Sequence, residues 1–338
     1  MKIAVIGAGA IGGLVGARLA LAGEDVTFMV RGANLDAIRA RGIRLVEIDG
    51  QVGTAAQVGA TDDYDAAGPQ DIVVLAVKAH QVAAVAGRIG KLFGPDTVIV
   101  TMQNGIPFWY FHRHGGEYEG RSVRSVDPDG VLARAIPPER ILGCVVYPAA
   151  ELTAPGTIRH IEGNRFPIGE LDGATTARGL KVSACFEAAG FKSPLLDDIR
   201  AEIWLKLWGN LSFNPISALA HSTLVDICQY PLTRELAADM MREAESVAGR
   251  LGIAFRVSLE RRIAGAEKIG KHKTSMLQDV EAGREPEIDA LVGSVIELAR
   301  MTGTPTPHID SAYALMKLLE RTMAQARGGV RLQAPVAA

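Results

Sequence analysis

The sequence predicts an α/β fold in two parts, a doubly wound parallel sheet followed by an all-α domain. In the first half of the chain, short apolar runs alternate with helical stretches, which is typical of βα units. From residue 197 to about residue 325 the apolar period is almost wholly helical, with few β-branched runs. The 338 residues are enough for both parts.

The first strand leads into a glycine-rich turn. Residues 3–6 form an unbroken apolar run, as expected of a buried strand, and Gly7, Gly9 and Gly12 follow with the spacing G-x-G-x-x-G. Gly7 allows a tight turn, Gly9 lets backbone amides approach a pyrophosphate, and Gly12 lets the next helix pack close to the strand. That helix is expected over residues 11–22, with Gly23 as its C-cap. The pattern predicts a Rossmann-type dinucleotide site, with the pyrophosphate at the helix N-terminus.

The second strand, residues 26–30, ends on Arg31 and not on an acid. A carboxylate at this position would bind the ribose of NAD, whereas an arginine accommodates the 2′-phosphate of NADP. Asp25 stands at the start of the strand, where it is badly placed for the ribose. The sequence therefore favours NADPH/NADP+ as the cofactor.

Further elements follow in order. Strands are expected at 43–48, 71–77, 97–101 and 141–147, a helix at 81–92, and a terminal hairpin from 158–161 and 165–168. The predicted domains are an NADP-binding domain at 1–196, a helical substrate and catalytic domain at 197–327, and a frayed tail at 328–338.

An irregular excursion, residues 107–130, interrupts the nucleotide domain. It opens with four consecutive aromatic residues, 108–111, which are expected to lie either over the cleft or on a partner subunit. The remainder, residues 112–130, is rich in charge and glycine and is expected to be a solvated, mobile tip.

Composition excludes several classes of function. The 36 basic residues nearly balance the 38 acidic ones, which argues against binding to nucleic acid or to a membrane surface. No apolar run reaches about 18 residues, and the first strand leaves no room for a signal peptide, so a cytoplasmic protein is expected. Cys144, Cys185 and Cys228 stand apart, as small buried residues in a reducing compartment would. His112 and His114 have no partner set nearby, so no metal site is predicted.

One predicted helix of the second part carries polar side chains in apolar surroundings. Lys206, Asn210 and Asn214 are spaced i, i+4, i+8, so they share a face, whereas their neighbours are mostly Trp, Leu and Phe. Pro215 disfavours helical geometry at Asn214, so the helix is expected to kink or end there. A partly desolvated lysine gives up its proton more readily, and the reduction of a ketone needs a proton donor. The alternative is a solvent-facing stripe.

Other polar residues stand at positions where ligands bind. Lys78 and Asn104 each follow a predicted strand, at the sheet edge that binds ligands in such folds. In the second part, Ser275 supplies a hydroxyl and Glu287 a carboxylate. Pro286 is expected in the first turn of a helix, which would put Glu287 at the edge of an apolar face.

Together these motifs resemble the ketopantoate reductases, or 2-dehydropantoate 2-reductases, over residues 1 to about 325. The resemblance rests on the GAGAIG turn, Arg31, V-K-x-x-Q at 77–81, Q-N-G at 103–105, W-x-K-L with two downstream asparagines, S-M-x-Q-D at 275–279 and E-I-D at 287–289. It implies an NADPH-dependent reduction of 2-dehydropantoate to (R)-pantoate, a step toward pantothenate.

The resemblance also implies a role for each matching residue. Lys206 would be the general acid, and Glu287 would orient it or bind the substrate hydroxyl. The residues implied to bind substrate are Asn104, which would also border the nicotinamide, Asn210, Asn214 and Ser275. Those implied to bind the cofactor are Gly7, Gly9, Ala10, Ile11, Gly12, Arg31, Lys78, Gln81 and Asn104. Of these, Arg31 and Lys78 would bind the 2′-phosphate, and Gln81 would lie near the adenosine.

Two other functions stay open. A paralogue that reduces another small 2-oxo acid would share the fold and cofactor, and the excursion at 107–130, which departs from the family pattern, bears on the substrate more than on the reaction. A non-enzymatic NADPH sensor would have lost Lys206 or Glu287, and both are present. The sequence also leaves a homodimer open.

Overall fold

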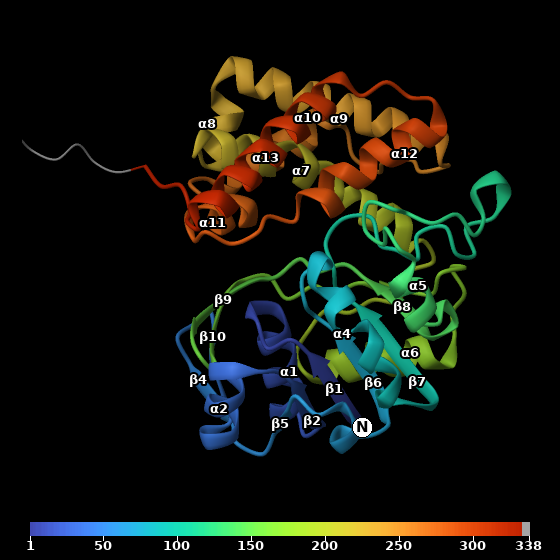
Figure 1. The fold of residues 1–338 in the computed structure, drawn as a ribbon, viewed down its shortest axis with the longest axis vertical. Coiled ribbons are helices and arrows are strands. Elements are labelled where there is room, and N and C mark those ends of the chain that lie inside the picture. The colour runs from blue at the N-terminus through green and yellow to red at the C-terminus, as the bar shows by residue number, and fades with distance from the viewer. Residues whose placement is uncertain (333–338) are drawn as a thin grey trace, which may run out of the picture. The chain divides into compact units, whose positions relative to one another are not determined.

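The computed structural model describes residues 1–332 and divides the chain into two compact units (Figure 1). The first comprises Met1–Asn104, Phe108–Ser122 and Asp127–Ile199; the second comprises Gly105–Pro107, Val123–Val126 and the chain from Arg200 onward. The predicted fold class is confirmed, with a mainly parallel sheet in the first unit and helices in the second. Pro107 and Val123–Val126 of the predicted excursion belong to the second unit, which a boundary drawn along the sequence does not anticipate.

The main sheet has seven strands among the described residues, in the order β11-β8-β7-β6-β1-β2-β5. All neighbours are parallel except β8 and β11. The strands are β1 (Lys2–Ile6), β2 (Asp25–Met29), β5 (Gly59–Thr61), β6 (Gln70–Leu75), β7 (Phe93–Thr101), β8 (Ile141–Cys144) and β11 (Ile168–Gly169). The helices of this unit are α1 (Ala10–Leu21), α2 (Gly32–Arg41), α3 (Tyr64–Ala67), α4 (Val82–Ile89), α5 (Val131–Ala135) and α6 (Ala177–Ala188).

A second, smaller sheet has the order β4-β3-β10-β9. Its strands are β3 (Ile43–Val46), β4 (Val52–Ala55), β9 (Ala149–Ala154) and β10 (Thr157–Glu162). The predicted hairpin of residues 158–161 with 165–168 is wrong, because β10 pairs with β9 and β3, and Ile168 pairs with β8. The tight turn lies before β10, at Gly156, whose φ of +70° suits glycine.

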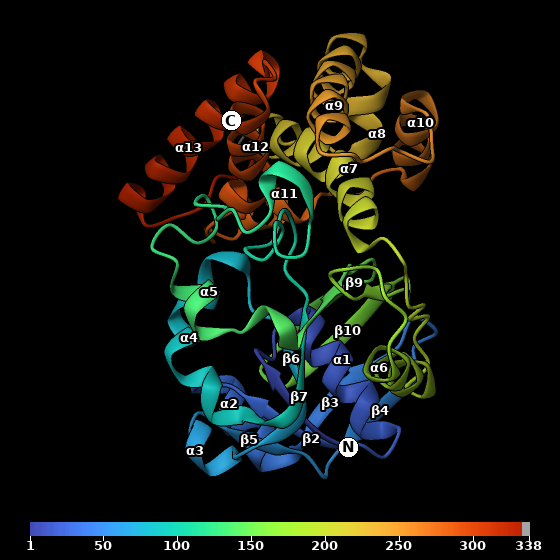
Figure 2. The same cartoon turned by 90° about the vertical axis from the view of Figure 1, so that its right-hand side faces the viewer.

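Helix α1 packs against strands of both sheets (Figure 2). A Cβ added at Gly13 would lie 2.4 Å from the Ile158 side chain, and one at Gly16 would lie 2.4 Å from the Phe28 ring. The glycines of α1 therefore let the helix approach one strand of each sheet more closely than alanine would.

A polar cluster also joins α1 to the small sheet. Arg18 of α1 donates from Nε and Nη2 to the two carboxylate oxygens of Glu47, at 2.8 and 2.6 Å. The buried His160 ring places Nδ1 3.0 Å from the same carboxylate, and its Nε2 lies 2.5 Å from the Gly163 carbonyl oxygen. The hydrogen bonds from Arg18, opposed by partial burial, hold the pKa of Glu47 below its usual value.

The aromatic start of the excursion is packed inside the chain. Trp109, Tyr110 and Phe111 are all buried, and Trp109 donates from Nε1 to Thr101 Oγ1 at 3.1 Å. Tyr110 and Phe111 stack edge to face with ring centroids 5.0 Å apart. Since one copy of the chain already buries these three rings, they are not the anchor of a partner subunit that the sequence left open.

The rest of the excursion is held by hydrogen bonds. The buried Asp127 carboxylate accepts from the amides of Leu132 and Ala133, at the start of α5. Glu297 accepts from two further amides, of Arg124 and Ser125, at 2.8 and 2.7 Å. Residues 112–130 are exposed or half-buried except Val123 and Asp127, so the expected solvated tip holds for most of the segment and is wrong only near these two buried residues, where Glu297 also satisfies two backbone amides.

From Arg200 onward the described residues of the second unit form helices joined by loops, with no strand among them. Its helices are α7 (Ile199–Ala220), α8 (Leu224–Gln229), α9 (Pro231–Arg250), α10 (Leu259–Ile269), α11 (Ser275–Glu281), the π-helix η5 (Asp289–Gly293), α12 (Ser294–Thr302) and α13 (Pro307–Ala326). Trp204 and Trp208 of α7 are fully buried, and Trp208 stacks on Phe255 with ring centroids 4.1 Å apart.

Helix α7 continues through Pro215 to Ala220, so the expected helix end at Asn214 is wrong. Proline removes one backbone hydrogen bond from the helix. The flanking Phe213 and Ile216 are buried, and the packing of such side chains, more than local propensity, determines whether a helix persists.

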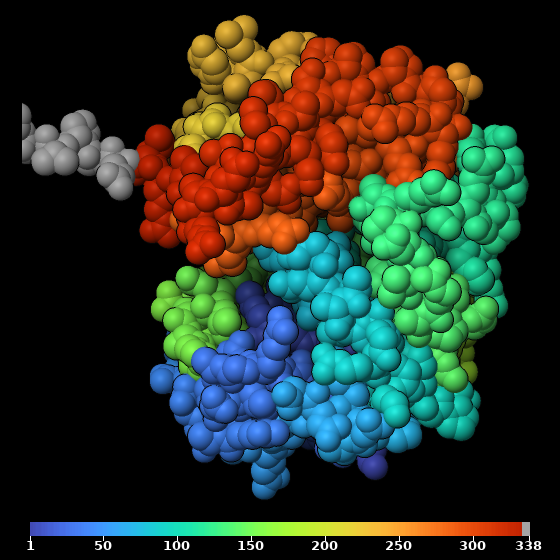
Figure 3. Space-filling view, viewed as in Figure 1, coloured from blue at the N-terminus to red at the C-terminus, as the bar shows by residue number. Residues whose placement is uncertain are grey.

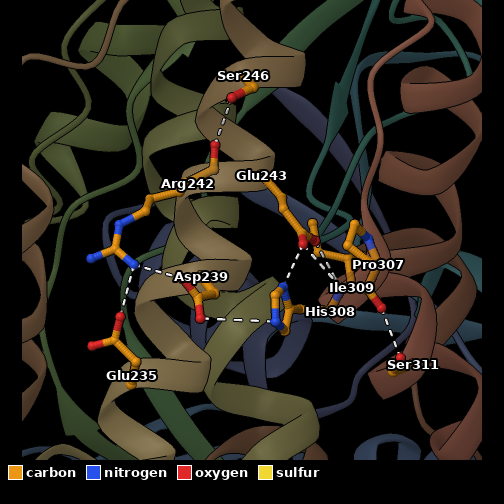
Figure 4. A network of polar contacts seen from close by, with 9 residues as sticks. All are labelled: Glu235, Asp239, Arg242, Glu243, Ser246, Pro307, His308, Ile309 and Ser311. Atoms are coloured by element: carbon orange, nitrogen blue, oxygen red, sulfur yellow. Dashed lines mark hydrogen bonds and ion pairs between the residues drawn. The ribbon is translucent and has the colours of Figure 1, made fainter.

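Helix α13 is held at its N-terminus by a side chain of α9. Glu243 accepts hydrogen bonds from the backbone amides of His308 and Ile309, at 3.0 Å each, and its Oε1 lies 2.6 Å from His308 Nδ1 (Figure 4). The N-cap residue, Thr306, makes no side-chain capping bond, so Glu243 satisfies amides that a local cap would otherwise serve.

The first part of the predicted frayed tail is mostly exposed but makes hydrogen bonds to α11. Val330 donates its amide to the Val280 carbonyl at 3.1 Å, and Arg331 donates from Nε to the Glu281 carbonyl at 2.6 Å. Residues 330 and 331 are therefore bonded to α11, whereas 333–338 lie outside the described residues.

Replacing Glu47 by glutamine is expected to lower the stability of the first unit in a pH-dependent manner. Because the folded state lowers the pKa of Glu47, its contribution is present above the usual glutamate pKa and disappears as the pH falls through the folded value. We expect a loss of about 1 kcal/mol at pH 7, as for a partly exposed pair. Thermal unfolding between pH 7 and pH 3 measures this loss of stability, and Glu151→Gln, at an exposed residue, is the control. A stability difference between the unmodified protein and Glu47→Gln that stays the same in acid would contradict the prediction.

Candidate cofactor and catalytic sites

Four segments of the first unit meet at one edge of the main sheet. Strands β2, β1, β6 and β7 are neighbours and run parallel, so their carboxyl ends lie together. Backbone hydrogen bonds link these ends directly: Gly7 N to Met29 O at 3.1 Å, Ala76 N to Ile6 O at 3.0 Å, and Met102 N to Leu75 O at 3.1 Å. The glycine turn and the segments that carry Arg31, Lys78 and Asn104 all begin at this edge, where the strand order reverses and ligands bind in such sheets.

The glycine turn has the backbone geometry that the sequence predicts. Gly7 has φ of +95°, and a Cβ there would lie 2.7 Å from Val77 Cγ1. A Cβ at Gly12 would lie 1.9 Å from the Gly7 carbonyl oxygen, so only glycine allows α1 to start this close to β1. At Gly9, by contrast, a Cβ would meet nothing within 4 Å.

The N-terminus of α1 is open for an anion. Its N-cap, Gly9, has no side chain that could cap the helix, and no acidic residue stands in the first turn. The backbone amides of Ala10 and Ile11 belong to the first turn of α1, where the helix dipole favours negative charge. The open space at Gly9 and these amides fit the pyrophosphate of a dinucleotide.

Two basic residues stand on either side of this turn. Arg31 is exposed and is the N-cap of α2, directly after β2. Lys78 is half-buried and precedes a short 3₁₀ turn after β6, and its amide donates to Gln81 Oε1 at 3.4 Å. Gln81 thus supports the turn that carries Lys78, in addition to the place near the adenosine that the resemblance implies.

Sequence reasoning missed two side-chain amides that hold this edge together. Asn34 donates to the Ala8 carbonyl at 3.3 Å and accepts from the Gly156 amide at 3.0 Å, which ties the glycine turn to the small sheet. Gln103 donates from Nε2 to the carbonyls of Leu75 and Val77, at 2.8 and 2.9 Å. Gln103 could have been found from the sequence because it is part of the Q-N-G motif, whereas no motif or spacing in the sequence points to Asn34.

The predicted catalytic face of the second unit lies on an unbroken helix. Because α7 spans Ile199–Ala220, Lys206, Asn210 and Asn214 do share one face of it. Lys206 and Asn210 are half-buried, and Asn214 is buried. The face is therefore not the fully solvent-exposed stripe that the sequence left open, and it presents one ammonium and two amides.

Ser275 and Glu287 lie on other elements of the same unit. Ser275 is the exposed first residue of α11, after the N-cap Thr274, whose hydroxyl accepts from the Leu277 amide at 3.2 Å. Glu287 is half-buried, and its carbonyl accepts from the Leu291 amide at 3.2 Å. The placement of Pro286 in a first turn is wrong: the helix begins only after Glu287, and it begins as a π-helix.

The cysteines offer no second reactive centre. Cys144, Cys185 and Cys228 are buried, and none of them forms a disulfide. Burial raises the pKa of the Cys185 thiol to about 12 and that of Cys228 to about 11, so neither is a thiolate near neutral pH. Among the described residues, no group of three histidine, cysteine or acidic side chains could hold a metal ion, and no helix is long and apolar enough to cross a bilayer.

Comparisons with known proteins agree over nearly the whole chain. The family model "Ketopantoate reductase PanE/ApbA" matches residues 3–173, and "Ketopantoate reductase PanE/ApbA C terminal" matches residues 198–320. A 2-dehydropantoate 2-reductase of Mesorhizobium japonicum is 51% identical over 320 residues, which cover 94% of this chain and 98% of that enzyme.

Solved structures show the same similarity. That of a provisionally named ketopantoate reductase from Ralstonia solanacearum MolK2 is 42% identical, with a TM-score of 0.91, and covers 96% of this chain and 98% of its own. That of a 2-dehydropantoate 2-reductase from Methylococcus capsulatus is 29% identical, with a TM-score of 0.82 and the same two coverages.

Replacing Gly9 and Gly12 by alanine is expected to separate ligand binding from folding. Gly9→Ala leaves the fold intact, because its Cβ meets no protein atom, but weakens dinucleotide binding about tenfold or more. Gly12→Ala forces α1 away from the Gly7 carbonyl and costs at least about 2 kcal/mol of stability. Thermal unfolding and fluorescence titration with NADPH measure the two effects.

Gly87→Ala in α4 is the matched control, since a Cβ there also meets nothing within 4 Å and it lies away from the glycine turn. It is expected to change neither ligand binding nor, by more than about 1 kcal/mol, stability. Full dinucleotide affinity in Gly9→Ala would exclude the glycine turn as the pyrophosphate site.

Proposed function

Because the chain belongs to the ketopantoate reductase PanE/ApbA family, we propose that it reduces 2-dehydropantoate to (R)-pantoate with NADPH. The observation that carries this proposal is the 51% identity to a 2-dehydropantoate 2-reductase across 94% of the chain. The open glycine turn in the first unit and the Lys-Asn-Asn face of α7 in the second support it, because they supply a dinucleotide cradle and a proton donor.

The proton donor in this proposal is Lys206. When bound, the dinucleotide supplies the hydride that reduces the carbonyl carbon. Lys206 donates a proton from its Nζ to the carbonyl oxygen as negative charge develops there, and the neutral amine regains a proton from solvent. Its place on a long helix between buried tryptophans fixes the side-chain root, so little reorganisation is needed when the proton moves.

Neighbouring polar groups then fix the substrate and the lysine. The amides of Asn210 and Asn214 lie one and two turns beyond Lys206 and would donate to substrate oxygens. Ser275, at the start of α11, would bind the substrate carboxylate, and Asn104 would border the nicotinamide. Glu287 would orient the lysine ammonium or accept a hydrogen bond from the substrate hydroxyl.

NADPH is proposed over NADH because of the two basic residues. Arg31 and Lys78 stand at the ends of β2 and β6, the strands on either side of the glycine turn after β1. No acid follows β2 to bind an unmodified ribose. A guanidinium and an ammonium at this edge would pair with the 2′-phosphate.

The direct test is the oxidation of NADPH, followed at 340 nm, with 2-dehydropantoate and a panel of other small 2-oxo acids. We expect 2-dehydropantoate to have the highest kcat/KM. A higher value for another acid would make the protein a reductase of that acid, and NADPH binding without turnover of any acid would indicate a sensor.

Lys206→Ala is expected to lower kcat by about 10²- to 10⁴-fold, the contribution typical of a general acid. NADPH affinity should not change, because the glycine turn and both basic cofactor residues are untouched. Steady-state kinetics and NADPH titration measure the two quantities. Lys268→Ala, which removes an exposed lysine from α10, is the control; turnover within a few fold of the unmodified protein would remove Lys206 from the mechanism.

Arg31→Ala is expected to raise KM for NADPH and leave KM for NADH nearly unchanged. The unmodified protein should prefer NADPH by at least about tenfold in kcat/KM, about 1.4 kcal/mol. Arg44→Ala, an exposed arginine of β3, is the matched control. Equal use of both cofactors by the unmodified protein would contradict the assignment.

A further inference from the structure

A π-helix begins just after Glu287. Residues Asp289–Gly293 form η5, which continues directly into α12 (Ser294–Thr302). Single π-turns are rare and occur mostly at functional sites, because the wider turn changes which backbone groups are free to bond elsewhere. Glu287 is the last residue before this helix, and its carbonyl accepts from the Leu291 amide at 3.2 Å, so the backbone position of η5 also sets that of Glu287.

The chain segment Gly105–Pro107, which belongs to the same unit, contacts η5. The Ala290 carbonyl, inside η5, accepts from the Ile106 amide at 3.1 Å and from Ser294 Oγ at 2.6 Å. Gly105, with φ of +87°, approaches so closely that a Cβ would lie 2.0 Å from the same carbonyl oxygen. This contact fixes one side of the π-helix.

Helix α13 fixes the other side at both ends of η5. At the first residue, Asp289 accepts from the Tyr313 hydroxyl at 2.6 Å and from Lys317 Nζ at 3.0 Å. At the last residue, Gly293, a Cβ would lie 3.1 Å from the Tyr313 ring, so this ring packs on the backbone there. One tyrosine thus contacts both ends of the π-helix.

The charges of this cluster are stable near neutral pH. Burial, together with the hydrogen bond to the Asp289 carboxylate, raises the pKa of Tyr313 to about 12, so the phenol keeps the proton it donates. Lys317 also pairs with Glu320 at 2.5 Å, so its ammonium is held between two carboxylates.

Helix α13 is itself a fixed support. Glu243 of α9 caps its N-terminus through the amides of His308 and Ile309 (Figure 4). In the space-filling view, the orange-red and red part of the chain, which includes α12 and α13, forms much of the side of the second unit that faces the viewer (Figure 3). The tyrosine that contacts η5 therefore comes from an anchored helix.

We propose that Tyr313 and Asp289 are positioning residues, which hold the π-helix so that Glu287 is presented for the reaction. This inference rests on the proposed function, in which Glu287 acts on the lysine or the substrate. Neither residue need touch substrate or cofactor; their hydrogen bond sets the backbone that carries Glu287.

Tyr313→Phe is the sharpest test, because it removes the hydroxyl and keeps the ring on Gly293. We expect kcat for 2-dehydropantoate to fall roughly 3- to 30-fold, the range that coupled neighbours give, while KM for NADPH stays unchanged. Asp289→Asn should have a similar effect, and Tyr230→Phe, at a tyrosine that is 58% exposed, should have none.

A double-mutant cycle with Glu287→Gln distinguishes positioning from general destabilisation. If Tyr313 acts through Glu287, Tyr313→Phe should cost little further activity in the Glu287→Gln background. Multiplicative losses in kcat, or a fall in kcat that simply follows a loss of thermal stability, would overturn the proposal.

Amide hydrogen exchange tests the same inference without relying on activity. The amides of Ile106 and Leu291 bond to the Ala290 and Glu287 carbonyls. In Tyr313→Phe they should exchange at least about fivefold faster than in the unmodified protein, and in Tyr230→Phe their exchange rates should not change. Unchanged exchange would overturn the positioning role. If the unmodified protein does not reduce 2-dehydropantoate, the proposed function fails, and the exchange result still decides whether Tyr313 fixes the π-helix.

Discussion

The close approach of Gly12 to the carbonyl of Gly7 is the constraint on which the cofactor side of the molecule depends. With a Cβ at 1.9 Å from that oxygen, any other residue would push α1 away from β1. The approach lets the helix begin only a few residues after the strand, so its first amides remain at the sheet edge and open to an anion. In the same helix, Gly13 and Gly16 allow close contact with Ile158 of the small sheet and Phe28 of the main sheet. The position of α1 therefore also affects how the two sheets pack.

The features that the sequence predicts are those that local physics determines. The alternation of apolar strands with helices, the glycine turn and the helical second unit follow from periodicity and from backbone conformations that favour glycine. The shared face of Lys206, Asn210 and Asn214 follows from helical spacing alone, and α7 is a continuous helix. The roles of these residues stay predictions, because spacing brings groups together without showing what they bind.

The features that the sequence does not predict depend on contacts between distant segments. Strand β10 pairs with β9 across a turn at Gly156 and with β3, which lies more than a hundred residues earlier in the chain. Trp109 bonds to Thr101 and packs against the backbone of Gly143, 34 residues further along the chain, so its burial cannot be read from four consecutive aromatic residues. Asn34 supports the glycine turn by bonds to two backbone groups that no local spacing connects.

Lys206 and Glu287, the residues proposed for catalysis, are supported by different parts of the second unit. Lys206 sits on a helix of 22 residues with fully buried tryptophans, which needs no further support. Glu287 stands at the very start of a helix and is bonded to it through its carbonyl, so its position depends on how the first turns of that helix are held. The π-helix after it offers a carbonyl to Gly105–Pro107 and a carboxylate to Tyr313. The helix interior that carries Lys206 and the helix start that carries Glu287 thus differ in support, and α13, which carries none of the proposed catalytic residues, contacts the second of them.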